Sequence, residues 1–306
     1  MLRKAYIALL LFLSLGVQGQ KTLIPNVSNY HLTWTTLNPA FSGYRDAISL
    51  SSLYQSGLYG GSGPQNMQVN MHSPVGNSKV GLGAVVSYNT SPPDDGMYAL
   101  MTTYAYRIYL GTGRLSFGMS AGLYGVRSDI NNLNIKNPGD ASFPEDVYSR
   151  WSPNFGVGVL YYTERLYVGV SVPELLAVPG ANQSLGANME DYRIIGIGAY
   201  RFDISPSFQL KPSVMLDYSR ASWAFKASLN AGLFQKNKVF IGAAYEHPNY
   251  IIALLNIQVN PKWLVGYAYT MGTGKVRTAL GGSHEIVLRW ELRPTIKTID
   301  EDPFYF

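Results

Sequence analysis

The connections between the strand-like runs of this chain alternate in length, and this alternation constrains its fold most strongly. About fourteen runs follow one another between residues 46 and 292, and every second connection is a tight turn. Short turns on one side and longer loops on the other are typical of an outer-membrane β-barrel, with the short turns in the periplasm. The pattern therefore predicts an all-β protein, an antiparallel up-and-down transmembrane barrel. The expected strands are 46–55, 65–73, 79–88, 97–110, 114–127, 153–162, 165–173, 191–202, 207–218, 223–234, 238–246, 250–259, 262–271 and 282–292.

Within these runs, apolar residues alternate with small or polar ones. In the run 114–127, Leu115, Phe117 and Met119 fall on one face, whereas Ser116 and Gly118 fall on the other. A period of two residues indicates a strand with two different faces, and an amphipathic helix would need a different spacing. We expect the apolar face to meet lipid. A soluble barrel with a tyrosine-rich core is the alternative, but it would leave these apolar faces uncovered.

Polar residues within the strands should face the barrel interior. A Lys or Arg on the lipid face would cost roughly 2–4 kcal/mol at mid-depth. The residues expected to face the lumen are Lys226, Asn230, Asn256, Gln258 and Arg289.

Two connections on the predicted outer side, 128–152 and 173–190, are long. Loops of more than about 15 residues inside a compact domain are usually functional. We therefore expect the partner-binding surface there. The candidate residues in or beside these loops are Asp129, Asp140, Phe143, Glu145, Asp146, Tyr148, Trp151, Asn182 and Glu190.

The two ends of the chain differ from the barrel region. Arg3 and Lys4 precede an apolar run of about eleven residues, which predicts a signal peptide over 1–19. Residues 20–45 then form a periplasmic or plug segment, and 293–306 form a periplasmic tail. An even number of strands would place both termini in the periplasm. Whether 20–45 enters the lumen or pairs outside is left open by the pattern.

Neither composition nor motifs favour catalysis. The four His are far apart, there is no Cys, and the run Gly272-Thr273-Gly274-Lys275 lacks the remaining residues of a phosphate-binding loop. The charge beyond residue 19 is +3, from +5 less Arg3 and Lys4, which is too mild to indicate nucleic acid. We expect no enzyme activity, no cofactor and no metal site.

The order of several short motifs resembles the PorP/SprF family of outer-membrane proteins of the type IX secretion system of Bacteroidota. The motifs span residues 35–292. They are Asn38-Pro39-Ala40, His72-Ser73-Pro74, Tyr104-Ala105-Tyr106-Arg107, Pro153-Asn154-Phe155-Gly156, Val172-Pro173-Glu174-Leu175-Leu176, Ile257-Gln258-Val259-Asn260-Pro261 and Gly282-Ser283-His284-Glu285-Ile286.

The resemblance implies a role in exporting a large protein, or in anchoring it at the cell surface. It implies a partner with a type IX C-terminal sorting domain, such as a gliding adhesin, and in some members a periplasmic lipoprotein that reaches peptidoglycan. The alternative function is a channel or transporter for small or hydrophobic solutes, because barrels of this size also serve that purpose. An open or a plugged lumen would distinguish the two.

Overall fold

A computed structural model describes residues 27–57, 64–76, 79–91, 95–129, 147–176, 192–219, 222–233, 239–273 and 282–292. The predicted signal peptide and C-terminal tail lie outside these residues. So do residues 130–146 and 177–191, which contain most of the two long outer connections.

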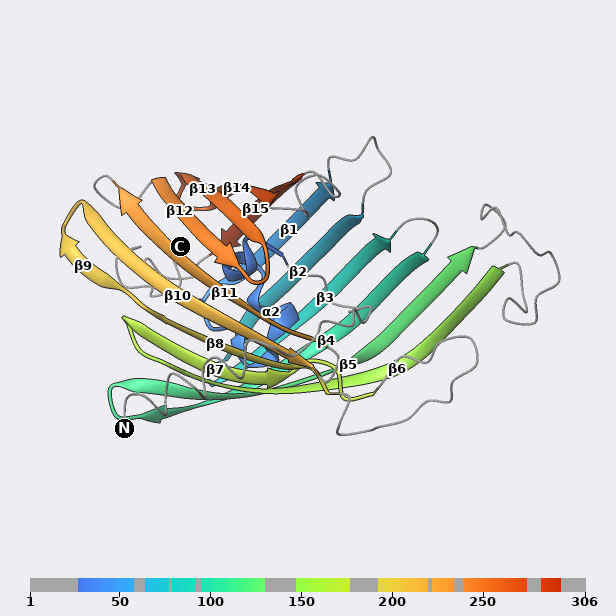
Figure 1. Cartoon of the computed structure of the whole chain (residues 1–306). Coiled ribbons are helices and arrows are strands. Elements are labelled where there is room, and N and C mark those ends of the chain that lie inside the picture. The colour runs from blue at the N-terminus through green and yellow to red at the C-terminus, as the bar shows by residue number, and fades with distance from the viewer. Residues whose placement is uncertain are drawn as a thin grey trace, which may run out of the picture.

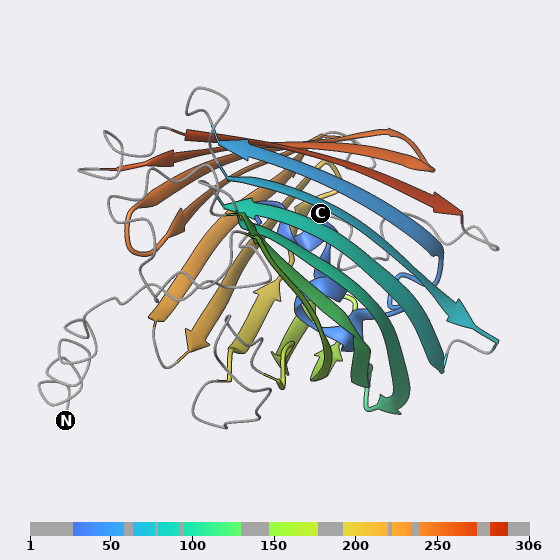
Figure 2. The same cartoon turned by 90° about the vertical axis from the view of Figure 1, so that its right-hand side faces the viewer.

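The described strands form one closed antiparallel barrel (Figures 1 and 2). The first strand β1 pairs with the last strand β15, from Ile48 opposite Leu292 to Gly57 opposite Ser283. Strands β8 and β9 both pair with β10 and continue one another, so the fifteen strands make a fourteen-stranded barrel. The strands are β1 (Ile48–Gly57), β2 (Gln65–Val75), β3 (Val80–Ser91), β4 (Asp95–Leu110), β5 (Gly113–Asp129), β6 (Val147–Tyr162), β7 (Leu166–Val172), β8 (Ile194–Tyr200), β9 (Phe202–Ser205), β10 (Phe208–Ser219), β11 (Ser222–Leu233), β12 (Val239–Glu246), β13 (Tyr250–Asn260), β14 (Trp263–Gly272) and β15 (Gly282–Leu292).

The predicted barrel fold and strand number are thus confirmed, with two corrections to boundaries. The predicted turn 203–206 is wrong, since β9 continues the strand to Ser205 after a break at Arg201. The outer loop 128–152 was predicted too long, because β5 and β6 remain paired as far as Asp129 opposite Val147.

The predicted strand 153–162 begins at Pro153, but this residue lies within β6 (Val147–Tyr162). The Leu175 nitrogen donates to the Phe155 carbonyl at 2.8 Å, so the backbone polar groups of Phe155 face away from β5. Alternate residues of a strand share that direction, and Pro153 therefore has its nitrogen on the same side. A proline there removes no bond to β5, which is why the strand tolerates it.

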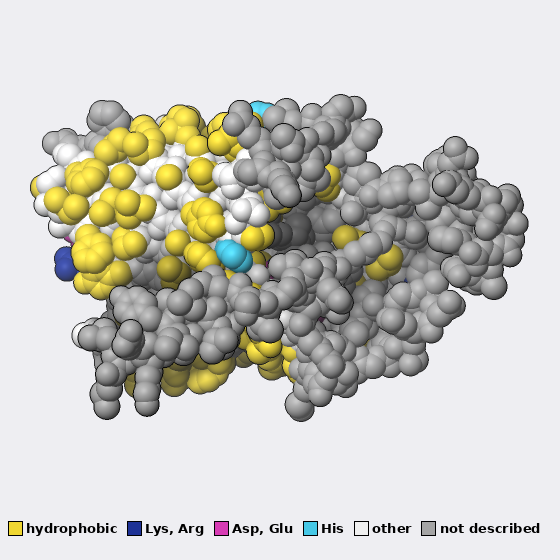
Figure 3. Space-filling view, viewed as in Figure 1, with side chains coloured by type: hydrophobic (Ala, Val, Ile, Leu, Met, Phe, Trp, Pro, Cys, Tyr) yellow, Lys and Arg dark blue, Asp and Glu magenta, His cyan; other side chains and the backbone are white. Residues whose placement is uncertain are grey.

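The barrel wall has an apolar outer face and a buried inner face. Leu82, Val86, Leu100, Phe117 and Met119 are among the exposed outer residues, whereas Ser116 is fully buried on the inside. Figure 3 shows hydrophobic side chains spread over the visible outer wall. A wall of this kind suits a lipid environment, as the alternation predicted.

The N-terminal segment lies inside the barrel. Two short 3-10 helices, η1 (Tyr30–Leu32) and η2 (Pro39–Phe41), flank the single-turn helix α2 (Trp34–Leu37), and all three are surrounded by strands in Figures 1 and 2. Between the two locations left open by the sequence, the structure therefore selects the lumen for the part of 20–45 that is described. None of the described helices is long and apolar enough to cross a membrane.

Candidate functional site: the occupied lumen

Residues 27–46, here called the plug segment, lie buried in the lumen and supply eight of the nineteen residues of its central hydrophobic cluster. An eight-stranded barrel is already filled by its own side chains, but fourteen strands leave a wider interior. Aromatic rings occupy this space: Trp34 stacks on Phe41 at 4.8 Å, and Tyr167 of β7 meets the edge of Trp34 at 5.4 Å. Tyr30 and Tyr44 complete the same cluster. The plug segment and the inner face of the barrel wall therefore form this core together.

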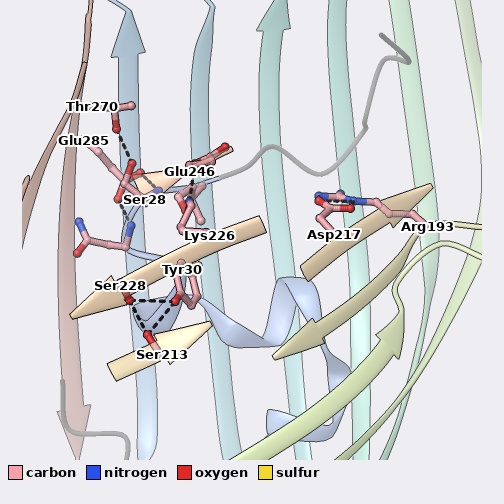
Figure 4. A network of polar contacts seen from close by, with 12 residues as sticks. Ser28, Tyr30, Arg193, Ser213, Asp217, Lys226, Ser228, Glu246, Thr270 and Glu285 are labelled. Carbon is pink, nitrogen blue, oxygen red and sulfur yellow. Dashed lines mark hydrogen bonds and ion pairs between the residues drawn. The ribbon is translucent and has the colours of Figure 1, made fainter. Parts of the chain in front are cut away.

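At one end of the plug segment, its backbone is held between a carboxylate and an ammonium group (Figure 4). The backbone nitrogens of Ser28 and Asn29 each donate to the Glu285 carboxylate at 2.7 Å. The Lys226 ammonium donates to the Val27 carbonyl at 2.8 Å and pairs with Glu246 at 3.0 Å. We call this arrangement the backbone clamp. It recognises main-chain atoms, so it constrains the path of the chain more than its side chains.

The middle of the plug segment is bonded to strands on opposite sides of the barrel. The Tyr30 hydroxyl lies 3.0 Å from Oγ of Ser213 and 3.4 Å from Oγ of Ser228 (Figure 4). On the other side, the Thr36 hydroxyl donates to the Asn70 side chain at 2.7 Å. Contacts in several directions prevent the segment from shifting towards any one wall.

One histidine of the plug segment also faces the wall. Nε2 of His31 lies 3.2 Å from the Asn256 amide nitrogen. Burial lowers the pKa of His31 well below its usual value, and the positive charges of Lys211, Arg289 and Lys226 lower it further. The imidazole is therefore neutral and accepts the amide hydrogen.

Asn38 shapes the turn into η2. Its side-chain oxygen accepts a hydrogen bond from the Ala40 nitrogen at 2.9 Å, while its amide nitrogen donates to the carbonyls of Val159 and Val170 at 3.3 and 3.4 Å. Asparagine before proline is a helix cap with a defined mechanism. Here the same side chain also ties the cap to β6 and β7.

Glycines on the wall allow the plug segment to approach closely. A Cβ atom at Gly118 would overlap the backbone of Ala40, and one at Gly158 would overlap the Asn38 side chain. By contrast, a Cβ at Gly198 would meet its nearest atom only at 3.9 Å. Contact with the plug segment thus explains Gly118 of β5 and Gly158 of β6, whereas Gly122 and Gly156 lie against Leu100 and Pro173.

Charged groups hold the other end of the plug segment. Arg45 forms a buried ion pair with Glu291, which also pairs with Arg289 at 3.2 Å. Asp46 pairs with Arg114 at 3.0 Å just before β1 begins. Gly43 has φ +69°, a conformation that favours glycine, and its carbonyl accepts a hydrogen bond from Arg107.

The five polar residues expected in the lumen are all buried. Lys226 and Asn256 contact the plug segment directly, and Arg289 pairs with Glu291. The other two bond locally, Asn230 to Ser228 and Gln258 to the Asn260 carbonyl. The structure thus brings Lys226, Asn256 and Arg289 into one site with the plug segment.

The residues expected to bind a partner are not gathered in the described structure. Asp129 and Tyr148 lie at the ends of β5 and β6, where only their backbones are described. Trp151 belongs to β6 and is 56% exposed, with its ring 6.0 Å from that of Tyr98. Asp140, Phe143, Glu145, Asp146, Asn182 and Glu190 lie outside the described residues.

A second polar arrangement, which the sequence did not reveal, lies where β7 ends. After Pro173 the chain turns back onto β6, where the Asn154 amide donates to the Leu176 carbonyl at 2.8 Å. The nitrogens of Leu175 and Leu176 donate to the Asn154 side-chain oxygen at 3.1 and 3.2 Å. The quoted motifs around Asn154 and Pro173 were the available signal, but their contact required the tertiary structure.

These contacts describe a site that holds a chain segment in place. Within the described part of the chain, no three His, Asp or Glu side chains group closely enough to hold a metal ion. The groups that converge in the lumen act on backbone atoms and on one another.

Comparisons with known proteins agree with this architecture. No curated protein matches the chain. Among solved structures, the toluene transporter TbuX of Ralstonia pickettii is similar with a TM-score of 0.52 and 10% identity, covering 85% of this chain and 93% of that one. The CymD monoaromatic hydrocarbon channel gives a TM-score of 0.49 and 12% identity, over 89% and 94% of the two chains. At such identities the likeness concerns the fold alone.

The family comparison is more specific. Residues 19–290 match the family described as type IX secretion system membrane protein PorP/SprF, over nearly the whole length of the chain. This match also covers the plug segment and all of its wall contacts up to Arg289. The chain therefore belongs to the PorP/SprF family of type IX secretion system membrane proteins.

Proposed function

We propose that this outer-membrane β-barrel of the type IX secretion system helps to export a large protein or to anchor it at the cell surface. The observation that carries the proposal is the occupied lumen. Family membership supports the secretion role, and the fold supports the outer-membrane location. A barrel whose interior is filled by its own chain suits a platform for a partner better than a pore.

The contacts of the plug segment support a closed lumen, because they involve strands on all sides of the barrel. Its hydrogen bonds and ion pairs include β15 at Glu285 and Glu291, β2 at Asn70, β5 at Ser116, β7 at Ser171 and β10 at Ser213. Each buried polar group that lost its partner would cost about 1–3 kcal/mol. Displacing the segment as a body would break many such bonds together, so passage of solute through the middle is disfavoured.

The partner would meet the protein outside this closed interior. The long outer connections remain the proposed surface for an exported protein with a type IX C-terminal sorting domain. A periplasmic lipoprotein that reaches peptidoglycan is the proposed partner of the opposite side. The bilayer is the third partner, and it contacts the apolar outer wall.

Conductance in planar bilayers tests the closed lumen. We expect the purified protein to show no steady open-state current. Gly118→Val should displace the plug segment from β5 and produce openings, whereas Gly198→Ala should stay silent because its Cβ has room. A large steady current from the wild-type protein would contradict the proposal and favour a channel for small or hydrophobic solutes.

Partner capture tests the secretion role. Affinity purification from detergent-solubilised outer membranes should recover a large exported protein with a C-terminal sorting domain. Deleting residues 131–147 should leave a folded, heat-modifiable barrel and abolish capture, whereas deleting 274–280 on the same side serves as a matched control. Normal capture by a folded 131–147 deletion variant would show that this loop is not the partner surface.

The solute-channel alternative has no specific support in the lumen. TbuX is a toluene transporter and CymD a monoaromatic hydrocarbon channel, but the likeness of this chain to TbuX concerns the fold alone, and CymD is less similar still. The conductance result decides between the two functions.

A further inference from the structure

The plug segment runs through the barrel in one direction, from the outer end to the periplasmic end. Its first residues contact the strands near one end of the barrel. Ser28 bonds to Thr270, two residues before β14 ends at Gly272, and to Glu285, three residues after β15 begins at Gly282. Lys226, which holds Val27, pairs with the last residue of β12.

Its last residues contact the strands near the opposite end. Ala40 accepts a hydrogen bond from Ser116, three residues after β5 begins. Arg45 pairs with Glu291, one residue before β15 ends, and Asp46 pairs with Arg114, one residue after β5 begins. Between Val27 and Asp46 the segment therefore passes along the length of the lumen.

The connections between strands identify the two ends. The connections at the end near Asp46 are all short, from two residues between β4 and β5 to five residues between β11 and β12. The end near Val27 carries both long connections, 130–146 and 173–193. Short turns face the periplasm in outer-membrane barrels, so Val27 lies towards the outside.

The backbone clamp keeps the chain at this position. Two main-chain nitrogens are bound by one buried carboxylate, and the adjacent carbonyl is bound by a buried ammonium group (Figure 4). Bonds between backbone and charged groups are stronger than neutral ones. The clamp therefore fixes Val27, Ser28 and Asn29 in the outer part of the lumen.

We propose that the plug segment threads the barrel, so that the chain preceding Val27 emerges at the outer mouth and is accessible from outside the cell. This differs from the sequence-based expectation that both termini lie in the periplasm. That expectation was based on the even number of strands. A segment that crosses the lumen before the first strand would move the N-terminal end to the outer side. The inference does not depend on the proposed secretion role, since it concerns the path of this chain alone.

Cysteine labelling in intact cells tests the thread directly, because the protein has no cysteine of its own. The test variant is Thr22→Cys, which the predicted cleavage after residue 19 would retain. The outer control is Asn249→Cys, in the exposed connection between β12 and β13, and the periplasmic control is Thr112→Cys, in the exposed turn between β4 and β5. The probe is a maleimide that cannot cross membranes.

We expect Thr22→Cys to label in intact cells as strongly as Asn249→Cys, and at least tenfold more than Thr112→Cys. Labelling only after permeabilisation, as expected for Thr112→Cys, would overturn the inference. Absence of labelling under both conditions would also overturn it, because a chain at the mouth must react. Heat modifiability verifies that each variant is folded.

A second measurement tests the same inference without relying on the reactivity of one introduced cysteine. An epitope inserted between Lys21 and Thr22 should be detected by antibody on intact cells. If only disrupted cells bind the antibody, the chain before Val27 lies on the periplasmic side and the thread is refuted.

Discussion

The two faces of the same strands follow different rules in this protein. On β15, Ile286 and Leu288 point outwards and are exposed, whereas Glu285, Arg289 and Glu291 point inwards and are buried. The outer face needs only to be apolar, because lipid offers no hydrogen bonds. The inner face must match the plug segment group by group. An apolar composition is thus sufficient for the outer wall, whereas the structure of the lumen depends on specific contacts.

The lumen combines close packing with buried charge. Glycines accept the plug backbone on one side, and charged side chains of the wall hold both of its ends. Buried charges are costly unless they are paired and hydrogen-bonded. The effect of a substitution in the lumen should therefore depend on the residue that the side chain contacts, whereas the effect on the outer wall should depend on polarity alone.

The largest effect is expected at Glu291, which serves two buried cations. Glu291→Gln would leave Arg45 and Arg289 without their shared carboxylate. Breaking a buried pair in this way costs roughly 3–5 kcal/mol of unfolding free energy. Urea unfolding in detergent, followed by the gel shift of the folded barrel, measures the change.

The control is an ion pair at the rim. Asp203 pairs with Arg165 and Arg201 at 3.0 Å, and its side chain is partly exposed. Asp203→Asn should cost less than about 1 kcal/mol. Equal losses for the two variants would mean that burial of the Glu291 cluster has no energetic consequence.

The next effect concerns the outer wall. Leu288→Arg places a charge against lipid and should cost about 2–4 kcal/mol at mid-depth. The amount of heat-modifiable protein in outer membranes should fall, while Leu288→Met should remain near wild type. Full assembly of the arginine variant would show that this face is not in contact with lipid.

The smallest effect is expected from a single hydroxyl. Tyr30→Phe removes the group that lies between Ser213 and Ser228 but keeps the ring in the aromatic cluster. We expect a loss of roughly 0.5–1.5 kcal/mol, measured by the same urea unfolding. Tyr109→Phe, at an exposed ring, is the matched control and should be neutral. A neutral Tyr30→Phe would imply that ring packing alone holds the plug segment.

Much of the barrel could be predicted because the alternation of apolar and polar side chains is visible within each strand. The alternation of Phe117 and Met119 with Ser116 and Gly118 identified both the strand and its faces. The start of β6 was harder, since Pro153 is a breaker in isolation. The proline is acceptable there because its nitrogen faces away from β5, so no bond to that strand is lost.

The site was less predictable than the wall. Polarity predicted that Lys226 and Arg289 face inwards, but Glu285 entered the sequence analysis only as part of the motif Gly282-Ser283-His284-Glu285-Ile286. The role of Glu285 depends on the backbone of Ser28 and Asn29, which lie 257 and 256 residues away in sequence. No local pattern specifies a contact between a side chain and so distant a backbone.

The barrel, its strand number and its lipid-facing wall could be read from the sequence, because a period of two residues and the turns between strands act over short distances. What fills the lumen, which way the plug segment runs and which charges hold it became visible only in the folded protein. Those features depend on closing the sheet between β1 and β15, which brings distant groups together in a shared space. Lipid is a uniform solvent, so it requires only that the outer side chains be apolar. The inner side chains must instead fit one particular segment of the same chain.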